Sequence, residues 1–326
     1  MRTLARSASL LLFFVAIGCG TAITAPENDA ATPTVDAATP LADTSTPVVD
    51  AAMPVDAYVR REDANVPVTT TSLVTGPYHV APGVEQTLCI TLDLGNDQPM
   101  MLRAVRTHLT DGSHHLVVSR ADGYPVDPTP TPCAPLTHGI GQSIFIAESH
   151  ESELVYPPGT GLPMAPHQVI GLELHMIDVT PTAIDIQGSV DFDLVPADPS
   201  LREVHILFTG NGSLSLPPHQ ATTVRGLFAL PDGSEILAMT THTHQLGTSA
   251  TLDITSSDGD PGRRVFENLD WSDPPLEVFD PPLVLAPGEQ VRLTCNYFNN
   301  TDDTVTFGTG FYDEMCFFWA YYVGGA

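Results

Sequence analysis

Lysine is absent from this chain of 326 residues, and arginine supplies all 12 of its basic side chains against 39 acidic ones. Without a lysine amine the chain can form neither a Schiff base nor a P-loop, because both depend on that group. A formal net charge of −27 also argues against a positive surface that could follow nucleic-acid phosphates. The sequence therefore excludes lysine-based catalysis and P-loop chemistry, and we expect no nucleic-acid partner.

Long hydrophobic runs are also missing, since none reaches the ~20 residues that a membrane-spanning helix needs. The apolar stretch Ala8–Ile17 follows a positively charged start and precedes small residues, which predicts a signal peptide over residues 1–18. The segment Ala16-Ile17-Gly18-Cys19 resembles the bacterial lipobox, in which the cysteine becomes the lipid-modified first residue. The alternative is ordinary cleavage beside an unmodified cysteine. We expect an exported bacterial lipoprotein, anchored to the cell envelope through Cys19 on its periplasmic or cell-surface side.

Cysteine is scarce, with five in the whole chain. An odd thiol is unusual in an exported protein, and assigning Cys19 to lipidation leaves four cysteines, which can pair in three ways. Pairing Cys89 with Cys133 and Cys295 with Cys316 closes the shortest loops and keeps each bridge within one half of the chain. We expect these two disulfides.

Long amphipathic helices are not evident either. Residues 19–67 are dominated by Ala, Pro, Thr, Val and Asp, a composition that predicts a disordered tether. Short alternating runs such as Gln86–Leu94 then follow one another, separated by Asp-Gly turns, and they predict strands. Their total length exceeds one ordinary sandwich, and the polar, proline-containing stretch Val195–Ser200 offers a boundary. We predict an all-β fold of two tandem antiparallel β-sandwiches, residues 68–198 and residues 199–326.

Histidine pairs are the first candidates for chemistry. His242 and His244 are two residues apart, so on a strand they share a face and can chelate one metal ion; the alternative is a pair of solvated side chains. Adjacent His114 and His115 point to opposite faces of a regular strand. Both can bind one metal only where the backbone bulges or ends, which the preceding Gly112 makes plausible.

Two single residues complete the candidate set. A lone strand histidine such as His175 is more often an ordinary polar residue than a ligand. Met315 discriminates between metals, because a soft thioether favours copper(I), whereas zinc recruits a further histidine, thiolate or carboxylate. The alternative for Met315 is gap filling in a hydrophobic core. Methionine near two histidines therefore favours redox-active copper.

Together these residues resemble the copper type II, ascorbate-dependent monooxygenases, the family of peptidylglycine α-hydroxylating monooxygenase and dopamine β-monooxygenase. The resemblance covers about residues 76–323. The similar stretches are Tyr156-Pro157-Pro158-Gly159-Thr160-Gly161, Thr241-His242-Thr243-His244-Gln245-Leu246-Gly247 and Asp313-Glu314-Met315-Cys316-Phe317. The resemblance implies jelly-roll-like sandwiches and two coppers per chain, one in each domain. The implied ligands are His114, His115 and His175 for the first copper, and His242, His244 and Met315 for the second.

The resemblance also implies an activity, the hydroxylation of a substrate C–H bond by O2 with ascorbate or a similar reductant as electron donor. Because a thioether stabilises the reduced metal that must meet O2, we expect catalysis at His242, His244 and Met315, with the three-histidine copper as an electron store. The implied partners are a small-molecule substrate, O2 and the reductant. The alternatives are a non-catalytic copper-binding surface lipoprotein and a purely structural β-sandwich protein.

Some positions depart from the family pattern. Where peptide-hydroxylating relatives carry Asn, Tyr and Arg, this chain has Phe317, Trp319 and Thr240, and strand alternation places the two aromatic residues beside the candidate methionine. The change favours an apolar or aromatic substrate stacked on these rings; the alternative is that they belong to the core. Glu173 and Asp178 stand where relatives carry amides, and the sequence assigns them no role.

Overall fold

The structure is a computed structural model, and it describes residues 66–134 and 141–324. The predicted signal peptide, Cys19 and the predicted tether up to residue 65 lie outside the described residues. The described residues all belong to one compact unit and form strands without a helix. Among them, accordingly, no helix is long and apolar enough to cross a membrane. The predicted all-β fold class is confirmed.

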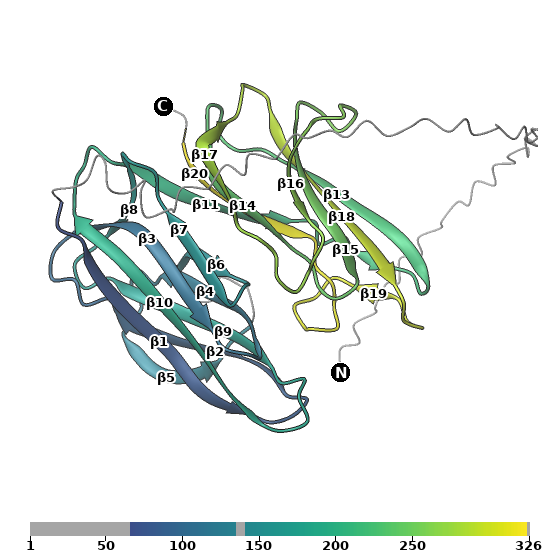
Figure 1. Cartoon of the computed structure of the whole chain (residues 1–326), viewed down its shortest axis with the longest axis horizontal. Coiled ribbons are helices and arrows are strands. Elements are labelled where there is room, and N and C mark those ends of the chain that lie inside the picture. The colour runs from purple at the N-terminus through teal and green to yellow at the C-terminus, as the bar shows by residue number, and fades with distance from the viewer. Residues whose placement is uncertain (1–65, 135–140, 325–326) are drawn as a thin grey trace, which may run out of the picture. The chain divides into compact units, whose positions relative to one another are not determined.

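The first half of the described chain packs two layers of strands against each other (Figure 1). One layer is the antiparallel five-stranded sheet β5-β2-β9-β4-β6, and the other contains β1, β10, β3, β7 and β8. Buried apolar side chains of both layers form the first core. The strands are β1 (Thr69–Val80), β2 (Glu85–Asp93), β3 (Met100–Leu109), β4 (Ser113–Arg120), β5 (Asp127–Pro132), β6 (Gln142–Ala147), β7 (Glu151–Val155), β8 (Thr160–Met164), β9 (Val169–Ile177) and β10 (Ile184–Pro196).

The second half repeats this arrangement with other strands. Its layers are the antiparallel four-stranded sheet β13-β18-β15-β16 and the run β11-β20-β14-β17, with a second core of buried apolar side chains. The strands are β11 (Arg202–Gly210), β12 (Ser215–Leu216), β13 (Gln220–Phe228), β14 (Glu235–His242), β15 (Gly247–Thr255), β16 (Arg263–Asn268), β17 (Glu277–Val284), β18 (Gln290–Asn299), β19 (Val305–Thr306) and β20 (Phe317–Val323).

One sheet runs through both halves. Strand β11 pairs in parallel with β8, where Arg202 lies opposite Thr160 and Glu203 opposite Gly161. This short pairing joins β1-β10-β3-β8 to β11-β20-β14-β17 and makes a nine-stranded sheet in which β7 also pairs with β3. The stretch Val195–Ser200 contains the link between β10 and β11. The two halves are therefore connected through hydrogen-bonded backbone as well as through side chains.

Strand β20 contributes to both cores because successive side chains of a strand point in opposite directions. Phe318 and Ala320 pack in the second core, whereas Trp319 and Tyr321 pack with side chains of the first half. The backbone amide of Ile146 donates a hydrogen bond to the Tyr321 hydroxyl at 3.2 Å. A strand of the second half thus fills part of the first core, which brings the ends of β6 and β14 together.

Both predicted disulfides are confirmed. Cys89 is bonded to Cys133, which ties β2 to the residue that follows β5. Cys295 is bonded to Cys316, which ties β18 to the residue that precedes β20. Since Met315 is the neighbour of Cys316, the second bridge fixes the backbone that carries the candidate methionine ligand.

Candidate metal centre

Five of the predicted ligands, which come from both halves of the chain, gather into two overlapping groups. In each group one ligand atom per residue lies within 4.8 Å of the others. The first group is His114, His115 and His175, and the second is His114, His242 and His244. His114 belongs to both groups, and its ring centroid lies 5.7 Å from that of His242 and 5.5 Å from that of His244. The structure thus places the predicted ligands of both halves side by side.

The first group is built by the neighbouring strands β4 and β9. His115 lies opposite His175 in the antiparallel ladder, and their ring centroids are 4.8 Å apart. The register of the ladder shifts between Ser113 and His115, so His114 is the extra residue of an irregular strand end. Such an irregularity lets two adjacent side chains turn toward one point. The predicted break in strand alternation at this pair is confirmed.

A carboxylate orients the third histidine of this group. Nε2 of His175 donates a hydrogen bond to Oε1 of Glu85 at 2.9 Å, while its Nδ1 is buried and has no hydrogen-bond partner. A hydrogen bond at one ring nitrogen fixes the tautomer and leaves the other nitrogen free to bind a metal. The same Glu85 oxygen accepts a hydrogen bond from the backbone amide of Phe311 at 2.8 Å, so it also contacts the second half.

The second group forms where β14 ends. His242 is the last residue of the strand, so His244 is not placed by strand alternation as the sequence predicted. Instead, the Nδ1 of His244 donates to the carbonyl oxygen of Asp313 at 2.9 Å, which leaves its Nε2 as the ligand atom. The ring centroids of His242 and His244 are nevertheless 4.9 Å apart. The two rings converge as predicted, but a hydrogen bond from a distant loop holds the second one.

Glu314 connects this pair to the predicted methionine ligand. Its fully buried carboxylate accepts hydrogen bonds from the backbone amides of His244 at 2.9 Å, Leu246 at 2.7 Å and Met315 at 3.3 Å. Burial raises the pKa of Glu314 to about 7, against the opposing effect of these hydrogen bonds. Met315 is itself buried. One side chain therefore holds the turn after β14 against the segment that carries Met315.

Burial favours the neutral form of His114, His115, His175 and His244. Burial lowers the pKa of His114 and His115 well below the ordinary value of 6.5, and the neighbouring imidazoles lower it further. Burial, followed by the effect of His242, lowers the pKa of His244 to about 3. Burial also lowers the pKa of His175, although the bond to Glu85 acts in the opposite direction. Neutral imidazole is the form that binds a metal, so no proton has to leave these rings first.

The donor atoms fit copper. Buried ring nitrogens of His114, His115, His175 and His242 have no hydrogen-bond partner within the described part of the chain. A buried polar atom without a partner costs about 1–3 kcal/mol, and a metal ion bound by these nitrogens would remove that cost. Imidazole nitrogens suit copper, as they do zinc, iron and nickel, whereas Mg²⁺ and Ca²⁺ prefer oxygen ligands.

The predicted substrate residues lie beside the second group. Thr240 and Trp319 are opposite each other on β14 and β20, and both are buried. The Trp319 ring centroid lies 6.4 Å from that of His242. Phe317 is half-buried and stacks on Phe208 at 5.3 Å between ring centroids. Trp319 therefore belongs to a packed core as well as to the surroundings of the candidate metal site, and a role in substrate binding stays a prediction.

The two acidic residues without a predicted role are both buried. Glu173 lies on β9, and its Oε1 is 3.8 Å from Nε2 of His115. Asp178 follows β9, and its Oδ1 accepts a hydrogen bond from the backbone amide of Thr180 at 2.8 Å. Glu173 thus faces the first histidine group, whereas the Asp178 hydrogen bond belongs to a local turn.

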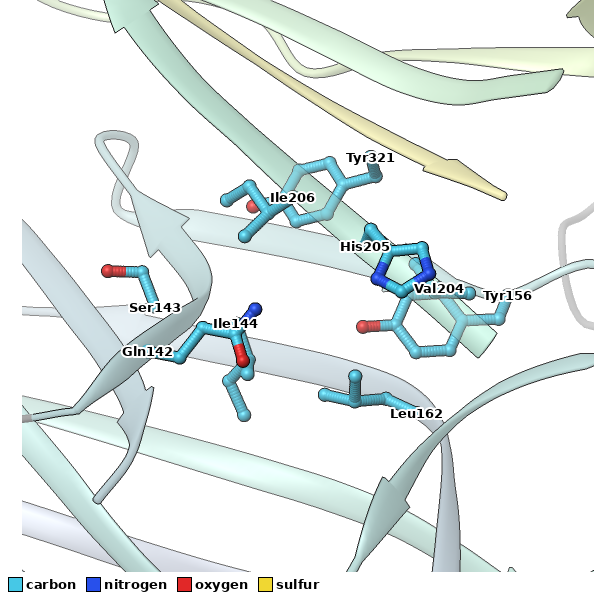
Figure 2. A pocket seen from close by; sticks show the side chains of 9 residues that line it. All are labelled: Gln142, Ser143, Ile144, Tyr156, Leu162, Val204, His205, Ile206 and Tyr321. Atoms are coloured by element: carbon cyan, nitrogen blue, oxygen red, sulfur yellow. The ribbon is translucent and has the colours of Figure 1, made fainter. Parts of the chain in front are cut away.

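A small cavity of about 10 Å³ lies between the halves, and none of the histidines of the two groups lines it (Figure 2). Its lining includes Tyr156 and Leu162 from the first half and Ile206 and Tyr321 from the second, and none of the predicted ligands. The volume corresponds to about one water molecule. The cavity is therefore a packing defect and not a substrate pocket.

Comparison with known proteins gives one informative match. Residues 220–325 match the family model described as copper type II ascorbate-dependent monooxygenase, C-terminal domain. The matched range contains His242, His244 and Met315, and it confirms over the second half the resemblance predicted from the sequence. No curated protein matches the chain.

Two of the solved structures that match show a weak similarity. The major capsid protein P2 of bacteriophage PM2 is 9% identical, with 79% of this chain and 97% of that chain covered and a TM-score of 0.37. PNGase F, a glycosylasparaginase from Flavobacterium meningosepticum, is 9% identical with the same coverage and a TM-score of 0.39. At these scores the similarity carries no argument about function.

Proposed function

We infer, from the match of residues 220–325 to the C-terminal domain of copper type II ascorbate-dependent monooxygenases, that the whole chain is a two-copper monooxygenase. The proposed reaction inserts one oxygen atom of O2 into a substrate C–H bond, and the second atom leaves as water. Two electrons from ascorbate or a similar reductant and two protons complete the balance. The observation that carries the proposal is the convergence of two three-histidine groups that share His114.

The candidate ligands of this chain would form two copper sites. His115 and His175, with His114, would hold one copper, and His242, His244 and Met315 the other. Copper, when bound, supplies one-electron transfer and the activation of O2. His115, His175, His242 and His244 are each only 1–2% exposed, so the protein excludes bulk water from the ligand atoms. Exclusion of water strengthens the electrostatic interactions inside the site and suppresses side reactions.

Hydrogen bonds to the outer ring nitrogens would keep the site organised. Glu85 holds Nε2 of His175, and the Asp313 carbonyl holds Nδ1 of His244. Each interaction fixes which nitrogen faces the metal and limits rotation of the ring. Because the two histidines use opposite ring nitrogens for these bonds, they would bind copper through Nδ1 and Nε2 respectively.

We propose a small apolar or aromatic substrate. Phe317 and Trp319 offer aromatic faces on β20, and Thr240 stands on β14 opposite Trp319. None of these three residues carries a positive charge that would bind a substrate carboxylate. Aromatic rings favour offset or edge-to-face contacts with an aromatic substrate, so a substrate beside His242 would be held by packing more than by ion pairing.

We further propose that the protein is exported and anchored by lipid at Cys19. The two disulfides support export, since such bonds persist in oxidising compartments. The test is expression of wild-type chain and a Cys19→Ser variant with a labelled fatty acid. Label and membrane association in the wild type only would support the anchor, and label in neither protein would contradict it.

The activity itself is tested by reductant-driven turnover. Copper-loaded protein is given ascorbate and 18O2 with a panel of small aromatic compounds, and products are analysed by mass spectrometry. The proposal expects a product carrying one 18O atom from the wild type, and none from His242→Ala or Met315→Ile. The matched control is His219→Ala, which alters an exposed histidine paired with Asp302 and should keep full activity. Loss of 18O incorporation in the control too, or equal products from all variants, would contradict the proposal.

Copper binding without turnover is the second candidate function. The deep burial of four ligand rings favours it, because substrate and O2 must reach the metal in an enzyme but not in a binding protein. The same assay separates the two functions. Copper bound at both sites, with no labelled product and no reductant-dependent O2 consumption, would favour the binding protein.

A further inference from the structure

A buried carboxylate from the first half faces a ligand of the second half. Glu148 directly follows β6, and His242 ends β14. Oε1 of Glu148 lies 2.5 Å from Nδ1 of His242, and the two side chains are 5% and 1% exposed. The contact therefore joins the two halves inside the protein, beside the candidate metal centre.

Few groups around Glu148 can compensate the negative charge of its carboxylate. Neither carboxylate oxygen has a hydrogen bond of good geometry among the described residues. Moving a carboxylate from water into a protein interior costs several kcal/mol unless a positive charge or strong donors compensate. The chain has no lysine, and the ion pair of Glu148 in the described structure is with His242. A cation next to His242 would supply the missing charge.

The other nitrogen of the same ring supports this interpretation. Nε2 of His242 is buried without a hydrogen-bond partner, and His242 lies in the second histidine group. A carboxylate at Nδ1 of an imidazole keeps the proton on that nitrogen, turns the lone pair of Nε2 toward the metal and makes the ring a stronger ligand. His244 differs, because its Nδ1 donates to the neutral carbonyl of Asp313.

We propose that Glu148 is the positioning carboxylate of the second copper site, which holds His242 in its metal-binding tautomer and offsets the charge of the ion. This inference rests on the proposed copper function and adds a residue that the first half supplies to the second site. The negative charge stabilises copper(II) more than copper(I), because the interaction grows with the charge of the ion. Glu148 therefore lowers the reduction potential of the copper bound by His242.

The test compares Glu148→Gln with wild-type full-length protein and with Glu151→Gln, a matched control at an exposed position three residues further along that faces His108. Copper(II) and copper(I) affinities are measured by competition titration, the reduction potential by equilibrium with redox dyes, and thermal stability without metal. Copper at the second site is identified as the copper that His242→Ala loses.

We expect Glu148→Gln to weaken copper(II) binding at the second site by roughly 10–100-fold and copper(I) binding by less. Each tenfold difference between the two losses raises the potential by about 59 mV for a one-electron couple. The metal-free variant should be as stable as the wild type or more so, since an uncompensated buried charge is removed. Glu151→Gln should match the wild type in every measurement.

Two results would overturn the inference while the proposed function stands. One is a Glu148→Gln variant with wild-type affinity and potential, in a protein whose second copper is lost by His242→Ala. The other is a variant that is less stable without metal but has an unchanged potential, which would make Glu148 a packing residue. A wild-type protein that binds no copper would overturn the function and this inference together.

Discussion

Glu85 accepts a hydrogen bond from Nε2 of His175 at 2.9 Å. The same carboxylate oxygen accepts a hydrogen bond at 2.8 Å from the backbone amide of Phe311, which lies in the loop that leads to Met315. One side chain on β2 therefore orients a ligand of the first histidine group and holds the segment that precedes a predicted ligand of the second. Glu85 thus links the two proposed copper sites.

Replacing Glu85 should weaken both sites, and the first one more. In Glu85→Ala the His175 ring loses the acceptor that fixes its tautomer, and we expect copper affinity at the first site to fall by roughly 10–100-fold. The second site should weaken less, through the loss of the Phe311 contact. Copper titration of the purified variant measures both effects, with Glu151→Ala as the exposed control. Unchanged affinity at the first site would show that Glu85 has no role in positioning His175.

The second prediction concerns His114, which belongs to both histidine groups. His114→Ala should remove a ligand of the first copper and should also weaken the second site indirectly, because the His114 ring lies 5.7 Å from His242 and 5.5 Å from His244 between centroids. His175→Ala should lower copper affinity at the first site only. Copper content after dialysis against a weak chelator distinguishes the two patterns. If His114→Ala and His175→Ala lose the same single copper, His114 serves only the first site.

The disulfides should differ in their effect on metal binding. Loss of either bridge is expected to destabilise the protein by about 2–4 kcal/mol, because each one restricts the unfolded chain. Only the Cys295→Ser/Cys316→Ser variant should also lose copper at the second site, since Cys316 is the neighbour of Met315. Denaturant unfolding and copper content of this variant and of Cys89→Ser/Cys133→Ser provide the comparison. Equal copper content in both would contradict a role of the second bridge in placing the methionine.

Acid should destabilise the metal-free protein through its buried histidines. The pKa values of His114, His115 and His244 are lowered in the folded state, mainly by burial, so below about pH 6.5 the unfolded chain binds protons that the folded protein does not. Each such histidine lowers the free energy of unfolding by about 1.4 kcal/mol per pH unit as the pH falls. For His244 this continues until its folded-state pKa of about 3.

Glu314 acts in the opposite direction over part of this range. Its folded-state pKa is raised from 4.5 to about 7, so its contribution to stability is present below about pH 4.5 and is lost as the pH rises through 7. Several histidines outweigh one carboxyl group, and the net result between pH 6.5 and 4.5 is a loss of stability on acidification. Urea unfolding of metal-free protein across this range measures the slope, which should be shallower in His115→Ala. A flat or rising stability toward low pH would contradict the account.

The sequence allowed the ligand-bearing parts of the site to be predicted, because their signals are local. The adjacent pair His114 and His115 after a glycine turn required a break in the strand, and the structure has one. The pairing of Cys295 with Cys316 followed from loop length. The convergence of His242 and His244 was predicted for the wrong reason, since the strand ends between them.

The acidic residues around the ligands could not be found from the sequence. Glu85 lies 90 residues from His175, and Glu314 lies 70 residues from His244. Neither shares a periodic pattern with its partner, and 39 acidic residues offer too many candidates. The parallel pairing of β8 with β11 escaped prediction for the same reason, because it depends on how the two halves pack. Such contacts depend on tertiary structure, and no local sequence pattern indicates them.

The number of coppers bound per chain shows whether these histidines are ligands. It is measured by elemental analysis of the purified full-length protein after loading with copper and removal of loosely bound metal. We expect two coppers per chain in the wild type and in the His219→Ala control, and one in each of His175→Ala and His242→Ala. A wild-type protein without bound copper, or variants that keep both coppers, would contradict the assignment of these histidines as ligands and with it the proposed monooxygenase.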